Sequence, residues 1–255
     1  MDIVCIGSGN VATHLAKAFK ASGARIVQVY SAHLLNADLL AQETSAQAIT
    51  DLATLNRGAD LYLIAVKDDA ITTVAHALSG VNGMVVHTSG ATPMSVLSDA
   101  GIQHYGVFYP LQTFSKSRDL NFANVPLCLE AKDADDLNVL RSLAQTLSPL
   151  VYEIDGEQRK ILHLAAVFAC NFVNHLYHLG GEILAEHQMD FEMLRPLIME
   201  TAEKVQAALP IQVQTGPAVR DDQETMKRHI SLLENRTDLQ EIYKFLSKSI
   251  KKTHS

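Results

Sequence analysis

The chain opens with MDIVCIGSGNVATHLAKAFKASGARIVQV, residues 1–29, which predicts a strand, a glycine-rich turn, a helix and a second strand. Residues 2–6 form a short apolar run of the kind found in strands buried on both faces. Apolar residues then recur at helical spacing until Gly23 ends the helix, and residues 25–29 form the next apolar run. This βαβ start is the segment around which the rest of the chain is organised.

The turn itself reads G-x-G-x-x-A, and its first five residues are candidate cofactor-binding residues: Gly7, Ser8, Gly9, Asn10 and Val11. In such a turn the first glycine permits the tight bend, the second lets a diphosphate approach the backbone, and the final small residue allows close helix–strand packing. The helix that follows offers free N–H groups and a favourable dipole to an anion. A purely structural turn is the alternative, but the strand–turn–helix–strand context favours nucleotide binding.

Length and composition restrict the function classes. The 255 residues suffice for one large domain or two modest ones, and 47% hydrophobic with 19% charged residues is typical of a soluble globular protein. A net charge of −7 argues against a nucleic-acid partner, because attraction to phosphates needs clustered basic residues. The basic cluster Lys248, Lys251 and Lys252 is interpreted as a solvated helix end.

The cysteines and the hydropathy bear on the compartment. Cys5, Cys128 and Cys170 lie in apolar runs without paired spacing, so we expect small buried side chains in a reducing compartment. We find no signal peptide before the first strand, and no apolar run approaches the roughly 18 residues of a membrane span. We therefore expect a cytoplasmic protein with no membrane partner.

Strand-like and helix-like segments alternate through the first part of the chain. Such alternation indicates βαβ units in a mostly parallel, doubly wound sheet of the Rossmann type, an α/β fold. After the first two strands, the further strands are expected at residues 46–49, 59–66, 83–87, 104–108, 126–130 and 150–154.

From Gly156 onward the pattern is helical. A long helix with few charges is expected to be buried on more than one side, at the centre of a helical domain or at a dimer interface. The sequence thus predicts a dinucleotide-binding Rossmann domain over residues 1–155 and an all-α substrate and dimerisation domain over residues 156–255.

Ligands of doubly wound sheets lie beyond the carboxyl ends of the strands. This rule places Val66, Lys67 and Ser89 at one rim as candidate cofactor-binding residues, and Tyr109 there as a candidate substrate-binding residue. A surface lysine and a helix-capping serine are the simpler alternatives for Lys67 and Ser89.

The loop after the second strand bears on the choice of cofactor. A carboxylate at that place would bind the ribose 2′-hydroxyl of NAD and repel the 2′-phosphate of NADP, but the sequence there is Tyr-Ser-Ala-His. NADP is therefore favoured, with Ser31 and His33 as hydrogen-bonding residues. The arginine expected for NADP is also missing, so NAD and an ordinary polar loop remain alternatives.

His163 and Asn171 are candidate catalytic residues. They are eight positions apart on one face of the long helix, where they suit a substrate carbonyl or imine. His163 can donate a proton because its unperturbed pKa lies near neutrality, and Asn171 can orient the substrate or His163. A core histidine and an interhelical amide hydrogen bond are the alternatives.

Arg220 is a candidate substrate-binding residue in the irregular loop over residues 215–222. It can clamp an anionic substrate group, or pair with Asp221 or Asp222 to cap the next helix. A different pattern, His175, His178 and Glu182 on one helix face, has metal-ligand spacing. No second cluster supplies the remaining ligands, so no metal is expected.

Taken together, these features resemble the NADP-dependent oxidoreductases related to pyrroline-5-carboxylate reductase and to the deazaflavin-dependent NADP oxidoreductases. Residues 6–12 resemble their glycine turn, and residues 65–67 resemble the end of their fourth strand. Those families pair a Rossmann domain with an all-helical, often dimer-forming C-terminal domain, so the resemblance implies a homodimer through the helical domain.

A Rossmann-like group of unknown substrate is more similar still, and the motifs that resemble it lie at residues 87–91, 108–114, 163–171 and 215–217 with Arg220. The related hydroxy-acid dehydrogenases carry a lysine four residues before a helix asparagine, where this chain has Val167. The glycine-rich proline site of pyrroline-5-carboxylate reductase is not recognisable either. Neither substrate is therefore carried over.

The sequence predicts an NADP-linked oxidoreductase that reduces a small carbonyl or imine in a cleft between the domains. The absence of the lysine leaves open a non-catalytic NAD(P)-binding module that reports redox state to a partner. A methyltransferase that uses S-adenosylmethionine is a more distant alternative, because a helical second domain does not suit it.

Overall fold

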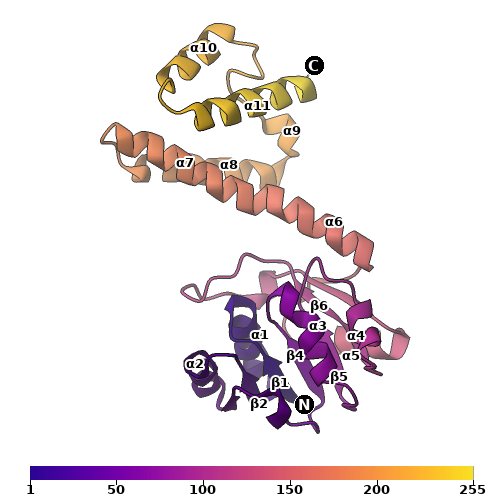
Figure 1. Ribbon diagram of the computed structural model, residues 1–255. Coiled ribbons are helices and arrows are strands. Elements are labelled where there is room, and N and C mark those ends of the chain that lie inside the picture. Colours follow the sequence, from indigo (N-terminus) through magenta and orange to yellow (C-terminus); the bar gives the residue numbers. More distant parts are fainter. Residues whose placement is uncertain (255) are drawn as a thin grey trace. The chain divides into compact units, whose positions relative to one another are not determined.

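The computed structural model describes residues 1–254. The chain divides into two compact units, Met1–Cys170 and residues 171–255. The first unit is built on an eight-stranded sheet with flanking helices, and the second is helical (Figure 1). The predicted fold class, a Rossmann-type α/β sheet followed by an all-α region, is confirmed.

The strand order is β3-β2-β1-β4-β5-β6-β7-β8. Strands β6 and β7 pair antiparallel and the other neighbours pair parallel. Because β4 pairs with β1 on the side away from β2, the order reverses there, and this switch point is where such sheets bind ligands. The strands are β1 Asp2–Ile6, β2 Arg25–Tyr30, β3 Gln47–Ile49, β4 Leu61–Ile64, β5 Met84–His87, β6 Tyr105–Pro110, β7 Leu127–Ala131 and β8 Val151–Glu153.

Helices cover both faces of this sheet. Successive side chains of a strand point to opposite faces, so Ile3 and Cys5 join one hydrophobic core while Val4 and Ile6 join the other. The first core includes α1 and α5 residues, and the second includes α3 and α4 residues. The helices are α1 Asn10–Ala21, α2 Leu34–Thr44, α3 Asp68–Ala77, α4 Ser95–Asp99 and α5 Ala134–Gln145, with short 3₁₀ turns at Leu52–Thr54 and Phe122–Asn124.

The long helix predicted from Gly156 is present, but it is not uniform. It consists of α6 Gly156–Ala166, a π-helical stretch Val167–Phe172 and α7 Val173–Glu186. The periodicity did not predict the π-helical stretch. The rest of the second unit consists of a 3₁₀ turn Phe191–Leu194 and the helices α8 Arg195–Ala207, α9 Pro210–Val213, α10 Gln223–Leu232 and α11 Thr237–His254.

The two units meet inside this long helix rather than at its start. The sequence places the domain boundary after residue 155, whereas the compact units divide between Cys170 and Asn171. The physical reason is that α6 belongs to the sheet unit. Its Arg159 binds Glu130 of β7, and its Leu162 packs against buried residues of β6 and β7.

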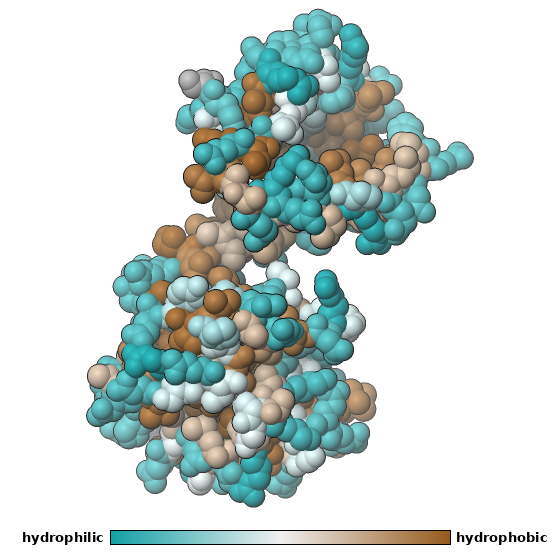
Figure 2. Space-filling model, turned by 180° about the vertical axis from the view of Figure 1, so that it is seen from behind, coloured by the Kyte–Doolittle hydropathy of each residue, from teal (hydrophilic) through white to brown (hydrophobic). Residues whose placement is uncertain are grey.

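Many apolar side chains of the helical region are exposed. Leu164 is 53% exposed and Phe172 is 50% exposed, so the expectation that the long helix lies at the centre of a helical domain is wrong for a single chain. Figure 2 shows such apolar side chains on the surface of the helical region. Among the described residues of the second unit, the buried hydrophobic ones are Ala218, Met226 and Leu239.

Two further expectations concern single residues and the membrane. Cys5 and Cys128 are buried as predicted, but the prediction is wrong for Cys170, which is exposed in the π-helical stretch. Within residues 1–254, no helix combines the length and the apolar character needed to cross a membrane.

Candidate functional site

A cavity of about 820 Å³ lies in the first unit at the carboxyl ends of the strands. Segments at the carboxyl ends of β1, β2, β4, β5 and β6 contribute to its wall. Of the sequence-predicted site residues, those that line it are Gly7, Ser8, Gly9, Asn10, Val11, Ser31, Val66, Lys67, Ser89, Tyr109 and His163. His33, by contrast, is an exposed residue at the start of α2 and is outside this lining.

The two glycines of the turn have different roles. Gly7 has a φ of +125°, and a Cβ placed on it would lie 2.1 Å from the carbonyl oxygen of Ala65, so the packing of β1 against β4 itself demands glycine. A Cβ on Gly9 would meet nothing within 4 Å, although Gly9 lines the cavity. Gly9 therefore borders open space that a ligand can enter and that a side chain would fill.

The start of α1 is electrostatically suited to an anion. Gly9 is the residue before the helix and supplies no side-chain cap, and the first turn holds no acidic residue. The first N–H groups of the helix are thus left for a ligand, and the helix dipole favours negative charge at this point. Together with the space at Gly9, this donor set fits a dinucleotide diphosphate.

Ser8 and Ser31 link the glycine turn to the end of β2. The Ser8 hydroxyl donates to the Ser31 hydroxyl oxygen at 2.9 Å, and both side chains are nearly buried. Ser31 Oγ also accepts from the backbone N–H of His33 at 3.4 Å. The polar end of β2 is therefore fixed against the turn.

Ser89 and Lys67 line the cavity, and each also has the local geometry of the simpler role considered for it, a capping serine and a surface lysine. The Ser89 hydroxyl accepts from the backbone N–H groups of Ala91 at 3.1 Å and Thr92 at 2.9 Å, as a turn-capping serine does. Lys67 precedes α3 and makes no side-chain capping bond.

Tyr109 and His163 form a pair at the wall of the cavity. Tyr109 Oη lies 3.0 Å from His163 Nδ1, and the rings meet edge to face at a centroid distance of 6.1 Å. Burial raises the pKa of Tyr109 to about 12, so the phenol keeps its proton at neutral pH. A hydroxyl can donate to the Nδ1 of a neutral imidazole or accept from that of an imidazolium, so the pair tolerates both protonation states of His163.

Gly90 lies directly against the imidazole. A Cβ placed on Gly90 would lie 2.7 Å from His163 Nδ1 and 2.8 Å from its Cγ. Any larger residue at this position would displace the ring from Tyr109. The loop after β5 and the helix α6 are thus packed closely where His163 borders the cavity.

Three residues behind this wall were missed in the sequence: the buried His87 and Arg159 and the half-buried Glu130. Arg159 could have been noticed because it precedes His163 by four residues, which places both on one helix face. His87 begins the motif at residues 87–91 but, like Glu130, reads as an ordinary strand residue.

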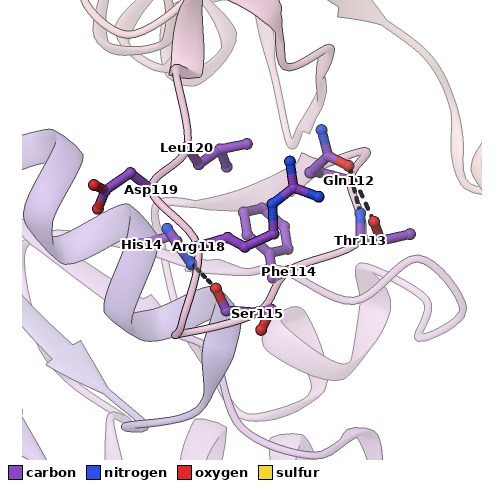
Figure 3. A pocket seen from close by; sticks show the side chains of 8 residues that line it. All are labelled: His14, Gln112, Thr113, Phe114, Ser115, Arg118, Asp119 and Leu120. Atoms are coloured by element: carbon purple, nitrogen blue, oxygen red, sulfur yellow. Dashed lines mark hydrogen bonds between the residues drawn. The ribbon is translucent and has the colours of Figure 1, made fainter. Parts of the chain in front are cut away.

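A second cavity of about 300 Å³ lies beside α1, under the loop that follows β6 (Figure 3). Asn10 Nδ2 donates to the Phe114 carbonyl at 2.9 Å, and His14 Nε2 donates to the Ser115 carbonyl at 2.9 Å. This loop is therefore tied to the first turns of α1. Phe114 lines both cavities, so the loop forms a shared wall. The Asn10 side chain is engaged by this loop.

The remaining predicted residues belong to the second unit. Asn171 is exposed in the π-helical stretch and Arg220 is exposed before α10. Hydrogen bonds from Thr225, and more weakly the charge of Arg220, lower the pKa of Asp222, whose carboxylate caps α10. The charge of Arg220 therefore lies near the cap of α10.

The histidine pattern on α7 also has structural partners. His178 Nε2 lies 3.4 Å from a Glu182 carboxylate oxygen, and Glu182 accepts from Arg236 at 3.0 Å. Throughout the part of the chain that the structure describes, no three His, Cys, Asp or Glu side chains are grouped as metal ligands would be.

The fold and the cavity place the protein in the Rossmann class, and comparisons with known proteins identify its family. Residues 2–88 match the family described as NADP oxidoreductase, coenzyme F420-dependent, and residues 125–250 match a domain of unknown function, DUF2520. A search of the curated proteins finds no match.

Solved structures match over the whole chain. A Bacteroides fragilis protein named putative NADP oxidoreductase is 45% identical, with 98% of each chain covered and a TM-score of 0.94. A protein from Thermotoga maritima is 21% identical, with 100% of this chain and 99% of that chain covered and a TM-score of 0.83. An imine reductase from Myxococcus stipitatus in complex with NADP⁺ is 16% identical, with 99% and 93% covered and a TM-score of 0.67.

At their low identity, the last two structures show a shared fold. The Bacteroides fragilis protein shows more, and the chain belongs to its family, that of NADP oxidoreductases whose N-terminal domain is of the F420-dependent type. The resemblance to NADP oxidoreductases seen in the sequence is thereby confirmed.

Proposed function

We propose that this protein is an NADP-dependent oxidoreductase that reduces a small carbonyl or imine substrate. The observation that carries the proposal is the cavity at the switch point, where open space at Gly9 meets the uncapped start of α1. Membership of an NADP oxidoreductase family supports the cofactor. The imine reductase of the same fold, which holds NADP⁺, supports the substrate class by analogy.

In this proposal each rim residue has a role. The Gly7–Val11 turn holds the diphosphate, Ser31 and His33 flank the adenosine ribose, and the loops at Val66 and Ser89 border the nicotinamide. The absence of a carboxylate at the end of β2 favours NADP over NAD. When bound, the cofactor supplies the hydride.

Side chains of the protein supply the proton that the reduction requires. His163 donates it to the reduced oxygen or nitrogen atom, and Tyr109 holds the imidazole in place through Nδ1. This leaves Nε2 to face the substrate. Asn171 and Arg220 stay sequence predictions as a substrate-orienting amide and an anion clamp.

We also propose a homodimer through the helical region. A helical unit whose buried hydrophobic residues, among those described, are Ala218, Met226 and Leu239 has too small a core to be stable alone. Exposed apolar residues on the long helix, such as Ile161 and Leu164, supply the surface that a second copy would cover.

The test is a calorimetric titration of NADPH and NADH into the wild type, Gly9→Ala and Gly58→Ala. A Cβ on Gly9 meets no protein atom, so that variant should keep the wild-type melting temperature but lose about tenfold or more in NADPH affinity. A Cβ on Gly58 would lie in ordinary van der Waals contact, 3.5 Å from Asn56 Oδ1, and Gly58 is outside the cavity lining, so Gly58→Ala should bind as the wild type does.

Absence of NADPH uptake by folded wild-type protein at millimolar concentration would refute the cofactor assignment. If NADPH binds, turnover on a panel of carbonyls and imines tests the reaction. Binding without turnover on any of them would favour the redox-reporting alternative.

A further inference from the structure

Arg159 is the largest of the fully buried side chains, with 1% exposure. A guanidinium is charged at every physiological pH, and removing it from water carries a large penalty unless its hydrogen-bonding groups are satisfied. Its position on α6, a helix with an otherwise exposed flank, therefore calls for an explanation beyond hydrophobic packing.

The guanidinium joins three separate elements of the first unit. Nη1 binds the Glu130 carboxylate of β7, and Nη2 donates to the Thr92 carbonyl at 2.8 Å, in the loop between β5 and α4. A planar guanidinium presents its donors in a rigid fork, so it holds two acceptors in fixed directions, whereas an ammonium group is a compact charge on a flexible stem. Arg159 thus fixes α6 to the sheet and to this loop together.

The loop between β5 and α4, which Arg159 holds, is one of the loops that line the cavity. Its first residues are fixed by His87, whose Nδ1 accepts from the Ser89 backbone N–H at 3.2 Å. Its last residues are fixed by the bond from Arg159 to Thr92. Between these two anchors lies Gly90, whose missing side chain leaves the room that the His163 ring occupies.

The same anchor sets the position of His163. Residues four apart on a helix lie on one face about one turn from each other, so fixing Arg159 fixes the rotation and height of α6 at His163. The imidazole can then lie against Gly90 with Nδ1 at 3.0 Å from Tyr109 Oη. The loop after β5 and the helix α6, which meet at His163, are therefore both held by the Arg159 side chain.

We propose that Arg159 is a positioning residue: by binding Glu130 and the Thr92 carbonyl together, it holds His163 in register with Tyr109 at the wall of the cavity. The catalytic use of this His163–Tyr109 contact rests on the proposed function, but the contact itself is present in the protein without any ligand. A role in stability alone would leave the His163–Tyr109 pair of the folded protein unchanged.

The test is nuclear magnetic resonance of the histidine side-chain nitrogens, with His163 assigned by His163→Gln. Tyr109→Phe provides the reference spectrum of an unpaired His163. The test variants are Arg159→Met and Arg159→Lys. The matched control is Arg141→Met, which removes another arginine–glutamate pair, that of Arg141 with Glu153 on the surface.

We expect Arg159→Met to move the His163 nitrogen resonances to the positions seen in Tyr109→Phe, and Arg141→Met to leave them as in the wild type. Arg159→Lys should move them in the same direction, because a lysine ammonium lacks the rigid fork of two nitrogen atoms with which Arg159 binds Glu130 and Thr92. Wild-type resonances in a folded Arg159 variant would overturn the proposal, as would a Tyr109→Phe spectrum that matches the wild type. If Arg159→Met does not fold, Arg159→Lys decides.

NADPH affinity separates this inference from the proposed function. Failure of the wild type to bind NADPH would remove the proposed function but leave the His163 resonances to decide on Arg159.

Discussion

Tyr109 and His163 are 54 positions apart in the chain, yet Tyr109 Oη and His163 Nδ1 lie within 3.0 Å of each other. The first lies near the end of β6 and the second lies on α6, so the pair exists because α6 packs against the carboxyl end of the sheet. A proton donor placed in this way depends on every contact that holds the helix there.

Gly90→Ala tests that dependence at its tightest point. The new Cβ would lie 2.7 Å from His163 Nδ1, so the ring must move away from Tyr109. We expect NADPH affinity to be retained and kcat to fall by about a hundredfold, the effect typical of displacing a catalytic group by about 1 Å. Steady-state kinetics and NADPH titration measure both quantities.

Ala91→Ser is the control, because it changes an exposed position of the same loop outside the cavity lining. An unchanged kcat in Gly90→Ala would mean that His163 is not the proton donor.

The alternating part of the fold is predictable because each strand carries its own local signal. Apolar runs of strand length, bounded by residues such as Gly23 and Gly101 that adopt positive φ, locate most of the sheet. The same alternation, with the rule on carboxyl ends, brings Gly9, Ser31 and Tyr109 to one cavity.

What the sequence does not reveal depends on distant contacts. Arg159 reads as a solvent-facing residue, since its acceptors are Glu130, 29 positions earlier, and a backbone carbonyl at Thr92, 67 positions earlier. The π-helical stretch Val167–Phe172 is equally hidden, because its apolar residues also fit an ordinary helical period.

His87 should make stability depend on pH. Burial, with a smaller contribution from the charge of Arg159, lowers its pKa from 6.5 to about 3. At pH values between these two, His87 is protonated in the unfolded chain but not in the folded chain. The free energy of unfolding should therefore fall by about 1.4 kcal/mol per pH unit as the pH drops below 6.5. Above 6.5 the His87 contribution is constant.

Urea unfolding at pH 5 and pH 7 checks this in the wild type, His87→Asn and His76→Asn. An asparagine at position 87 can still accept from Ser89 but does not titrate, so the difference between the two pH values should shrink. His76 is exposed on α3 and serves as the control. Equal pH dependence in the wild type and His87→Asn would show that His87 does not titrate as described.

Ser31→Asp should change the cofactor preference. Ser31 lines the cavity at the end of β2, where a carboxylate would repel a 2′-phosphate and accept from a ribose hydroxyl. We expect the Kd for NADPH to rise by about tenfold or more, with the Kd for NADH unchanged or lower. The neutral, similarly shaped Ser31→Asn is the control, and equal NADPH affinity in both variants would place the 2′-phosphate elsewhere.

Leu164→Asp should weaken the proposed dimer. Leu164 is 53% exposed on α6, so a charge there costs little in the single chain but becomes buried without a partner in the interface. Sedimentation should give the wild type about twice its chain mass of 27.9 kDa and shift Leu164→Asp toward the monomer. Leu35→Asp changes a leucine that is 71% exposed on α2, a helix outside the proposed interface, and should sediment as the wild type does. A monomeric wild type at micromolar concentration would mean that the apolar side chains of the helical region have another partner or none.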